Sequence, residues 1–450
     1  MINGAISHWW AALPTEPRRA PLPGPTEADV AIVGAGYTGL WTAYYLKRAR
    51  PDWRVVVLER ESAGFGASGR NGGWLSGLLA GSRERYAQTH GRAAVVAAQR
   101  AMFAAVGEVE AVCAAEGIDC DLVRGGSLDV ARSPTAAKRL AERLADQRAW
   151  GFGEEDWRAL DASEVRARVG VRSAVSGVFT PHCARVQPAK LIRGLAAAAE
   201  RAGVEIFEGT PVVALGPHVA TTPYGDVRAP WIVRATEGYT AGLPGLRRRL
   251  VPMNSSMVVT APIAGLGWAG AETLRDADHV FSYLQRTADG RVAIGGRGVP
   301  YRFGSRTDRA GEVAPRTVTA LRDRLEAILG LGDVALDHAW GGVLGVARDW
   351  CPAVGANPAT GIAWAGGYVG DGVSTANLAG RTLRDLLLRE DTELARLPWV
   401  GHASPDWEPE PLRYLGVRTV YGLYRAADWH EARTHRSSPF AAVAGLLAGR

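Results

Sequence analysis

The stretch that most constrains the fold lies near the N-terminus, where a short apolar run leads into the glycine-rich sequence GAGYTG at residues 34–39. Residues 29–33 (DVAIV) have the composition of a buried parallel strand. Residues 37–50 place apolar side chains at helical spacing until a proline ends the pattern. A second strand follows at residues 54–58 (RVVVL) and closes with Glu59. This order of strand, glycine turn, helix, strand and acid predicts a Rossmann-like dinucleotide-binding unit.

Each part of this unit has a physical task. Gly34 permits the tight turn, Gly36 lets the backbone approach a pyrophosphate, and Gly39 lets the helix pack closely on the strand. The pyrophosphate then lies at the helix N-terminus, where free N–H groups and the helix dipole attract anions. Glu59, at the end of the second strand, can accept hydrogen bonds from both hydroxyls of an adenosine ribose. An acid at this position also disfavours a 2′-phosphate.

A second glycine-rich segment, ERESAGFGASGRNGGW at residues 59–74, starts at this acid. Its glycines let main-chain N–H groups approach the cofactor, so we expect the segment to pass back over the pyrophosphate. Ser68 is expected to bind a phosphate oxygen, and Arg70 or Asn71 to reach a phosphate or the polar edge of the cofactor. The alternative is a flexible surface loop, which the density of small and hydrogen-bonding residues disfavours.

A third glycine-rich segment lies late in the chain, at residues 362–388, and has the pattern of a strand (IAWAG), a turn (GYVGDG) and a helix. Backbone amides of Gly370, Gly372 and Val373, supported by the helix dipole, would face negative charge at the N1–C2=O edge of a reduced flavin. One glycine turn would then hold the pyrophosphate and the other the isoalloxazine ring. An NAD enzyme does not need the second turn, so the pattern favours FAD over NAD.

Composition excludes several other classes of protein. A chain of 450 residues is too long for one ordinary core, which predicts two domains. The net charge of +6 comes from arginines scattered over every segment, so nucleic acid is not an expected partner. The four cysteines form no CxxC pair, and we expect neither disulfides nor a metal site. The absence of a signal peptide pattern and of a long apolar run predicts a cytoplasmic protein without a membrane span.

Three segments together resemble one family: GAGYTG, the loop GASGRNGG, and WAGGYVGDGVSTANLAGR at residues 364–381. The chain is similar to the D-amino-acid oxidase superfamily of FAD-dependent oxidoreductases, and most similar to the branch that contains gamma-glutamylputrescine oxidase. The resemblance extends from about Trp9 to about Arg433. It implies an α/β fold with a Rossmann-like FAD-binding domain, discontinuous in sequence, and a second domain with an antiparallel sheet for the substrate.

The resemblance also implies an activity. Members of the superfamily oxidise a C–N bond by passing hydride to flavin N5; the imine is then hydrolysed, and O₂ or another acceptor reoxidises FAD. We expect a small amine or amino acid as the substrate and O₂ as the acceptor, with release of hydrogen peroxide. One alternative is a flavin dehydrogenase of the same fold that acts on an amino or 2-hydroxy acid and passes electrons to a quinone or another carrier. A second alternative is a flavoprotein without catalysis, and an oligomer is left open.

The expected cofactor-binding residues come from the glycine-rich segments and from two further places. The resemblance places the backbone of Val212 near the adenine, although an ordinary core role is equally open. Gly342 stands where covalent sarcosine oxidases have a cysteine that bonds the flavin, and the GASGRNGG loop has no histidine, so we expect non-covalent FAD. The full expected set is Gly34, Gly36, Tyr37, Thr38, Gly39, Glu59, Arg60, Gly66, Ala67, Ser68, Arg70, Asn71, Gly72, Gly73, Val212, Gly342, Gly370, Asp371, Gly372 and Val373.

Candidates for the substrate side come mainly from the antiparallel domain. Tyr283 and Arg297 are expected to face the flavin, and Arg297 could bind a substrate carboxylate, with a surface ion pair as the alternative. His182 is placed near the flavin only by its neighbourhood, and a structural histidine is the stronger alternative. Trp340 and Tyr368 could wall an amine pocket through cation–π contacts, with core packing as the alternative. No acid–base residue is assigned as catalytic.

The expected domain division interleaves the two units along the chain. The FAD-binding domain is expected to comprise residues 1–80, 160–245 and 336–400. The substrate domain is expected to comprise residues 81–159 and 246–335. Within it, an ADG turn at residues 288–290 predicts a hairpin. A helical arm at residues 401–450 is expected to dock on the FAD-binding domain, with an oligomer contact as the alternative.

Overall fold

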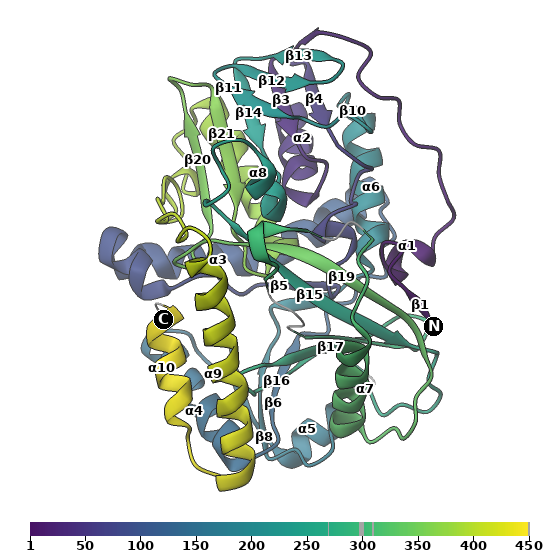
Figure 1. Cartoon of the computed structure of the whole chain (residues 1–450), viewed down its shortest axis with the longest axis vertical. Helices are drawn as coiled ribbons and strands as arrows, with labels where there is room; N and C mark the ends of the chain where they lie inside the picture. Colours follow the sequence, from purple (N-terminus) through teal and green to yellow (C-terminus); the bar gives the residue numbers. More distant parts are fainter. Residues whose placement is uncertain (269, 297–300, 308–309, 449–450) are drawn as a thin grey trace.

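The computed structural model describes residues 1–268, 270–296, 301–307 and 310–448. Two large sheets lie one above the other along the long axis of the molecule (Figure 1). The upper sheet is mainly parallel and is covered by helices, whereas the lower sheet is mainly antiparallel. This arrangement confirms the expected α/β fold, in which a Rossmann-like domain lies beside an antiparallel-sheet domain.

The upper sheet has six strands, and all neighbours except the last pair run parallel. In order across the sheet they are β10 (Glu205–Phe207), β4 (Val55–Leu58), β3 (Val30–Val33), β14 (Trp231–Arg234), β21 (Ile362–Gly366) and β20 (Ala353–Asn357). The three glycine-rich or acidic segments found in the sequence follow β3, β4 and β21. Because parallel strands end at one edge, the sheet brings these segments together.

Alternate residues of β3 enter different cores, because both faces of the upper sheet are covered. Val30 and Ile32 pack among helices on one face, and Ala31 and Val33 pack under a small sheet on the other. The helices of the first face are α2 (Tyr37–Ala49), α3 (Arg83–Glu116), α6 (Pro188–Arg201) and α8 (Gly372–Leu388). The small sheet contains β11 (Ala214–Gly216), β12 (Val219–Thr222), β13 (Gly225–Arg228) and β2 (Thr26–Glu27).

The lower sheet has nine strands. In order they are β1 (Ile2–Asn3), β19 (Leu336–Val346), β15 (Val251–Thr260), β18 (Val292–Gly296), β17 (Ser282–Arg286), β16 (Thr273–Asp276), β6 (Ser127–Ala131), β8 (Ser176–Thr180) and β7 (Arg158–Asp161). Strands β17 and β18 form the hairpin predicted around residues 288–290. Further elements of this half and of the junction are α1 (His8–Ala11), α4 (Pro134–Ala149), α5 (Ala162–Arg168), α7 (Pro315–Leu329), and the pair β5 (Trp74–Ser76) and β9 (Cys183–Arg185).

Sheet membership differs from the expected domain division in several segments. Strands β1, β8 and β19 pair in the lower sheet, although the sequence predicts residues 1–80, 160–245 and 336–400 to belong to the FAD-binding domain. Helix α3, assigned to the substrate domain, packs into the core of the upper sheet instead. An apolar strand pattern shows that a segment is buried, but it does not show which sheet completes its hydrogen bonds. For this reason the boundaries could not be derived from the local sequence.

The C-terminal arm contains two helices, α9 (Leu412–Thr434) and α10 (Pro439–Ala448). Val417 and Tyr421 of α9 pack against apolar residues of β15 and β19, and Glu431 pairs with Arg139 of α4. The arm therefore lies mainly along the lower, antiparallel half of the molecule (Figure 1), and of the residues that the sequence assigns to the FAD-binding domain it contacts β19 and its neighbours Trp350 and Val369. Among the described residues, no helix combines the length and the apolar composition needed to cross a bilayer.

Candidate active site

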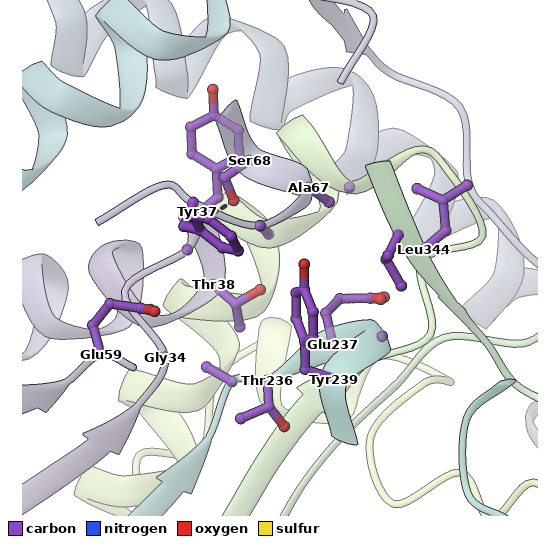
Figure 2. Close-up of a pocket in the computed structure, with 18 of the residues that line it drawn as sticks. Gly34, Tyr37, Thr38, Glu59, Ala67, Ser68, Thr236, Glu237, Tyr239 and Leu344 are labelled. Atoms are coloured by element: carbon purple, nitrogen blue, oxygen red, sulfur yellow. Dashed lines mark hydrogen bonds between the residues drawn. The ribbon is translucent and has the colours of Figure 1, made fainter. Parts of the chain in front are cut away.

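A cavity of about 370 Å³ lies where β3, β4, β14 and β21 end at the carboxyl edge of the upper sheet, and β19 of the lower sheet closes one side. Open α/β sheets bind their ligands at this edge. Figure 2 shows that side chains from these separate segments converge on one space. Of the expected cofactor residues, those on its wall are Gly34, Gly36, Tyr37, Thr38, Glu59, Arg60, Gly66, Ala67, Ser68, Asn71, Val212, Gly370, Gly372 and Val373.

The first glycine turn brings strand, helix and neighbouring strand into close contact. Gly34 has a φ of +107°, and a Cβ there would lie 2.7 Å from the carbonyl oxygen of Ala235, which follows β14. A Cβ on Gly39 would lie 1.9 Å from the carbonyl oxygen of Gly34, closer than atoms can approach. Gly39 itself is not on the cavity wall. Its absent side chain lets α2 pack against the end of β3 and so places the N-terminus of α2 at the cavity.

Glu59 lies at the end of the cavity formed by β3 and β4. Its Oε2 accepts the N–H of Ala35 at 2.8 Å, and its Oε1 accepts the N–H of Glu61 at 2.9 Å. These two bonds fix the carboxylate against the first turn, and each oxygen retains a further lone pair. Burial raises the pKa of Glu59 to about 7, against the lowering effect of the backbone hydrogen bonds. Donors from a ligand would stabilise the charged form.

The GASGRNGG loop covers the N-terminus of α2. The Ser68 hydroxyl accepts the N–H of Tyr37 at 2.8 Å, and its own proton remains available for an anion. A Cβ on Gly36 would lie 3.0 Å from Ser68 Oγ, so glycine allows this approach. Asn71 donates through Nδ2 to the carbonyls of Ala67 and Ser68 and thereby holds the loop in a turn. The loop is therefore ordered by its own polar groups.

Other residues of the loop turn away from the cavity, contrary to expectation. Arg70 is 3% exposed and donates to the carbonyl oxygens of Phe65 at 2.8 Å and Gly341 at 3.1 Å. It ties the loop to β19 and is not part of the cavity wall, so a phosphate or flavin contact of Arg70 is not supported. A Cβ on Gly342 would lie 3.3 Å from Arg70 Cβ, so Gly342 packs against Arg70, and it is not on the cavity wall either.

Gly72 and Gly73 follow Arg70 on the side away from the cavity. A Cβ on Gly72 would lie 2.8 Å from the ring of Tyr283, and a Cβ on Gly73 would lie 2.0 Å from the side-chain amide of Gln285. These two glycines let the loop pack on β17 of the lower sheet. Their role in the structure is close packing and not a direct contact with the cavity.

The second glycine turn also lines the cavity, through Tyr368, Gly370 and Gly372. Gly370 has a φ of +115°, and α8 begins at Gly372. Tyr368 lines the cavity between the two turns, and its hydroxyl lies 2.9 Å from Thr38 Oγ1 of α2. Asp371 is not on the cavity wall. Burial raises the pKa of Asp371 to about 6, against the opposing effect of the Arg275 guanidinium.

Glu237 is the main residue of the cavity that the sequence analysis missed. Its Oε1 accepts the N–H groups of Gly367 at 3.0 Å and Tyr368 at 3.1 Å, and its Oε2 accepts the N–H of Gly345. One carboxylate thus joins the second turn to β19. Burial raises the pKa of Glu237 to about 7, and the three backbone N–H groups oppose that shift. The available signal was its place after the strand WIVRA, which β3 and β21 flank.

Comparison with known proteins decides the family. Residues 29–386 match the family described as FAD dependent oxidoreductase. The chain belongs to this family. It is 30% identical over 375 residues to gamma-glutamylputrescine oxidoreductase of Escherichia coli, covering 81% of this chain and 84% of that protein. It is 29% identical over 408 residues to the probable oxidoreductase OrdL of Rhizobium meliloti, covering 87% and 90%. The resemblance stated from the sequence motifs is therefore confirmed.

Solved structures agree at the level of the fold. Glycine oxidase from Geobacillus kaustophilus superposes with a TM-score of 0.70 at 24% identity, over 84% of this chain and 100% of that chain. L-proline dehydrogenase from P. horikoshii superposes with a TM-score of 0.69 at 19% identity, over 84% of this chain and 98% of that chain. The two-sheet architecture of this FAD-dependent oxidoreductase is thus shared with these enzymes.

The cavity of this FAD-dependent oxidoreductase has the donor and acceptor set that FAD needs. Glu59 offers carboxylate oxygens for ribose hydroxyls at one end, and Ser68 offers a hydroxyl donor near the N-terminus of α2. Helices α2 and α8 both start at the cavity, and their own N-cap residues, Gly36 and Asp371, make no capping hydrogen bond. Helix N-termini attract negative charge, which suits a pyrophosphate and the pyrimidine edge of a flavin. The residues present therefore fit the cofactor of the family.

Most of the candidates for the substrate side lie away from the cavity wall. The ring of His182 stacks on Phe103 at 3.6 Å, and its Nε2 lies 2.8 Å from Asp156 Oδ1, as in a structural histidine. Trp340 is fully buried, and its Nε1 donates to the carbonyl oxygen of Arg70, so it packs the core and does not wall a pocket. Arg297 lies outside the described residues.

Tyr283 and Tyr368 differ from these core residues. The hydroxyl of Tyr283 lies 2.8 Å from Ser255 Oγ, and its ring meets Trp74 edge to face at 6.1 Å. It lies behind Gly72 of the GASGRNGG loop and is not among the residues of the cavity wall. Tyr368 is the candidate that does line the cavity.

One group of potential metal ligands lies next to the second turn. Side-chain ligand atoms of Asp349, Cys351 and His402 lie within 4.8 Å of one another. His402 Nε2 is 2.7 Å from Asp349 Oδ2, and hydrogen bonding to this carboxylate is the main cause that raises the pKa of His402 to about 9. A protonated imidazole pairs with the carboxylate and does not bind a metal. The expectation of a protein without a metal stays a prediction.

Proposed function

We propose that this FAD-dependent oxidoreductase oxidises the C–N bond of a small amine or amino acid, with non-covalently bound FAD and with O₂ as the electron acceptor. FAD supplies the hydride acceptor, flavin N5, and the protein supplies binding, orientation and electrostatics. The 30% identity with a gamma-glutamylputrescine oxidoreductase supports an amine substrate. The fold shared with a glycine oxidase and an L-proline dehydrogenase is compatible with the wider class.

The observation that carries this proposal is the convergence of two helix N-termini on one cavity. Helices α2 and α8 begin on the cavity wall, and their N-cap residues, Gly36 and Asp371, make no capping hydrogen bond. Ser68 accepts the first N–H of α2 and can donate its own proton to an anion. The two helix ends therefore suit two anionic or electron-rich groups of one ligand. A cofactor with a pyrophosphate and a flavin has both groups.

The residues around the cavity have distinct tasks in the proposal. Glu59 binds the adenosine ribose, and Ser68 donates its hydroxyl to a phosphate oxygen. The amides of Gly370, Gly372 and Val373 stabilise negative charge at the flavin edge next to α8. Glu237 holds this turn in place by accepting two of its N–H groups. The backbone near Val212 lies at the adenine end. Tyr283 remains a candidate for orienting the substrate from the lower sheet.

Two observations support non-covalent FAD. None of the residues that line the cavity in the described part of the chain is a cysteine or a histidine. The four cysteines are all buried elsewhere. These are the side chains by which a flavin would be attached in the relatives considered in the sequence analysis. Acid precipitation of the yellow protein is expected to release all flavin to the supernatant, and flavin retained in the pellet would contradict the proposal.

The test of the function is an anaerobic titration of the purified holoenzyme with amines, gamma-glutamyl amines, N-methyl amino acids, D- and L-amino acids and 2-hydroxy acids. The flavin absorbance near ~450 nm reports reduction directly. We expect an amine or an amino acid to bleach this band, and admission of air to restore it with release of peroxide. Bleaching without rapid reoxidation would favour the dehydrogenase alternative. Bleaching by dithionite alone would contradict an amine-oxidising function.

A further inference from the structure

In the C-terminal helix α10 the small side chains are buried and the large apolar side chains are exposed, the reverse of the usual arrangement. Ala444 and Ala448 are buried against the rest of the molecule, and Ala441 and Gly445 are half-buried beside them. All large apolar side chains of the helix point outward instead. These are Phe440, Val443, Leu446 and Leu447, which are 40%, 48%, 80% and 50% exposed and which we call the apolar face of α10.

The spacing of these residues makes one continuous surface. Positions 440, 443 and 447 follow the i, i+3, i+7 pattern of a single helix face, and position 446 lies beside 443. Trp429 of α9 is 58% exposed, so a large aromatic side chain is accessible on the other helix of the arm as well. A helix that docks through alanine and glycine and exposes leucine and phenylalanine has the composition of an interaction surface.

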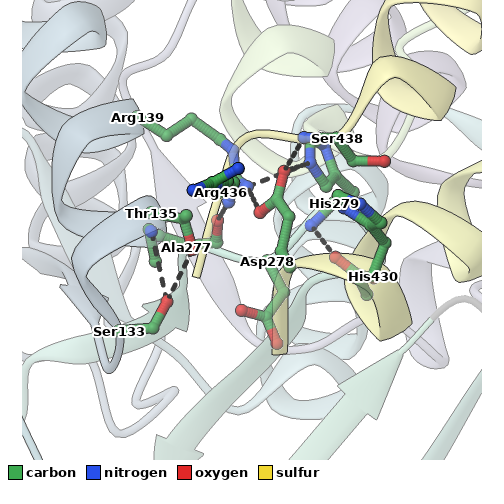
Figure 3. Close-up of polar contacts among 12 residues, drawn as sticks. Ser133, Thr135, Arg139, Ala277, Asp278, His279, His430, Arg436 and Ser438 are labelled. Carbon is green, nitrogen blue, oxygen red and sulfur yellow. Dashed lines mark hydrogen bonds and ion pairs between the residues drawn. The ribbon is translucent and has the colours of Figure 1, made fainter. Parts of the chain in front are cut away.

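The two acids of α9 and α10 turn inward and are satisfied there. Asp428 accepts the N–H groups of His279 and Val280, both at 2.9 Å. Glu431 accepts from His279 at 2.9 Å and pairs with Arg139 of α4. Figure 3 shows this polar cluster between the arm and the lower half of the molecule. The arm is therefore fixed to the body while its outer surface stays free of carboxylates.

Arg413 of α9 is buried and pairs with Glu410, but four other arginines of the arm lie on the outside. Arg418, Arg425, Arg433 and Arg436 are all exposed, and residues 412–448 contain no acid besides Asp428 and Glu431. The guanidinium of Arg433 lies over the ring of Trp429 at 4.1 Å. An exposed apolar face, an exposed tryptophan and a set of outward arginines are the features of helices that lie in the interface of an anionic membrane.

We propose that the C-terminal arm is a membrane-association surface, in which the apolar face of α10 inserts at the boundary of an anionic lipid bilayer and the arginines contact lipid phosphates. The helix lies in the plane of the interface and does not span the membrane. A second copy of the chain is the less suitable occupant. A twofold contact through this face would place the same arginines opposite one another without acids to neutralise them.

The test uses the full-length holoenzyme and two kinds of vesicle, one of phosphatidylcholine alone and one of phosphatidylcholine mixed with phosphatidylglycerol. Cosedimentation is measured at low and at high salt. We expect binding to the anionic vesicles only, and a several-fold loss of the bound fraction at high salt, because salt screens exposed charges. No binding to anionic vesicles, or equal binding to both kinds, would overturn the proposal.

Variants show whether vesicle binding depends on the C-terminal arm or on another part of the surface. Leu446→Glu combined with Leu447→Glu is expected to lower the bound fraction at least tenfold, while FAD absorbance stays unchanged. Tyr224→Glu is the matched control, because Tyr224 is a large side chain of the upper half, between β12 and β13, that is 43% exposed. This control is expected to bind as the parent does. Equal binding by the leucine variant would overturn the proposal, provided that its FAD content is normal.

The alternative, a contact between two copies of the chain, is tested by the mass of the protein in solution. The mass of the parent in solution is measured by light scattering at several concentrations, and the same is done for Phe440→Glu combined with Val443→Glu. The proposal predicts one mass for both proteins, together with loss of vesicle binding in the variant. A dimer that dissociates in the variant would assign the apolar face of α10 to a contact between copies and would overturn the membrane assignment.

Discussion

At each of the two glycine turns of the cavity, a carboxylate accepts backbone N–H groups. The two carboxylates lie at very different distances along the chain from the turns that they hold. In the β3–α2 turn, Glu59 accepts the N–H of Ala35, 24 residues away. In the β21–α8 turn, Glu237 accepts the N–H of Gly367, 130 residues away. Each turn leads into a helix that begins on the cavity wall. A partly buried carboxylate thus fixes the backbone in both turns, but only the first turn is contained in one strand–helix–strand unit that the sequence reveals.

The two acids are electrostatically alike in the protein described here. Burial raises the pKa of each to about 7, and backbone N–H groups oppose the shift in both. They differ in the proposed function, where Glu59 also receives ribose hydroxyls and Glu237 serves the backbone alone. The comparison therefore teaches that position after a parallel strand, more than the glycine motif, decides where such a carboxylate can act.

The largest expected effect is a difference in stability between alanine substitutions at the glycines of the two turns. Gly39→Ala would place a Cβ 1.9 Å from a backbone oxygen of the first turn, which must force α2 away from β3. We expect a loss of ~3 kcal/mol in the free energy of unfolding and a protein with little FAD. Gly372→Ala is the control, because its nearest contact is the Tyr368 ring at 3.2 Å and the site is helical. Urea unfolding measures both, and equal losses would contradict the comparison.

The next effect concerns FAD affinity. Glu59→Ala removes the acceptor of the ribose hydroxyls, and a loss of about 3 kcal/mol corresponds to a roughly 100-fold higher Kd for FAD. Equilibrium dialysis of the apoprotein with FAD measures this change. Glu205→Ala is the control and should leave the Kd within a few-fold, because Glu205 lies on the neighbouring strand β10, pairs with Arg54 at the surface and does not line the cavity. An unchanged Kd in Glu59→Ala would contradict the ribose contact.

Glu237→Ala should act on stability more than on affinity. It leaves the N–H groups of Gly345, Gly367 and Tyr368 without their acceptor, for which we expect a loss of about 2 kcal/mol in the free energy of unfolding of the apoprotein. Urea unfolding without FAD provides the measurement. If the variant were as stable as the parent, Glu237 would not hold the second turn.

The pH dependence distinguishes the two acids further. A carboxyl whose pKa rises from its usual value to about 7 on folding contributes stability that is complete below pH ~4.5 and is lost as the pH rises through 7. Glu237→Gln should reduce this loss of stability with rising pH, both with and without FAD. Ribose donors favour the charged form of Glu59, so FAD binding should release a proton near pH ~6.

Calorimetry of FAD binding in buffers of different ionisation enthalpy measures this proton release. We expect the release to disappear in Glu59→Gln and to persist in Glu237→Gln. Release that persists in Glu59→Gln would assign the proton to another group and would contradict the difference between the two turns.

The smallest effect tests the ion pair beside the second turn. The pKa of His402 is raised to about 9 by Asp349, so this pair contributes stability that is complete below pH ~6.5 and lost as the pH rises through 9. Because His402 is partly exposed, His402→Gln should lower the free energy of unfolding by only about 1 kcal/mol at pH ~6 and by almost nothing at pH ~10. Urea unfolding at the two pH values provides the test. A loss that is equal at both would show that packing, and not charge, is involved.

The local units of this protein could be predicted from its amino-acid sequence. The β3–α2–β4 unit with Glu59, the β21–α8 turn and the hairpin around residues 288–290 follow from short-range periodicity, glycine positions and turn chemistry. These features depend on backbone geometry and burial within a few tens of residues, which the sequence displays directly. They were sufficient to indicate the fold class and the cofactor of the family.

Which distant segments meet became clear from the three-dimensional structure alone. It placed Glu237 at the second turn, turned Arg70 toward the carbonyl of Gly341, buried Trp340, and laid α9 along the lower sheet. A long polar or aromatic side chain has the same local signature whether it faces a ligand, a backbone carbonyl or the core. Its role is set by the partner that the fold brings within hydrogen-bonding distance, and that partner lies too far along the chain to be read from local pattern.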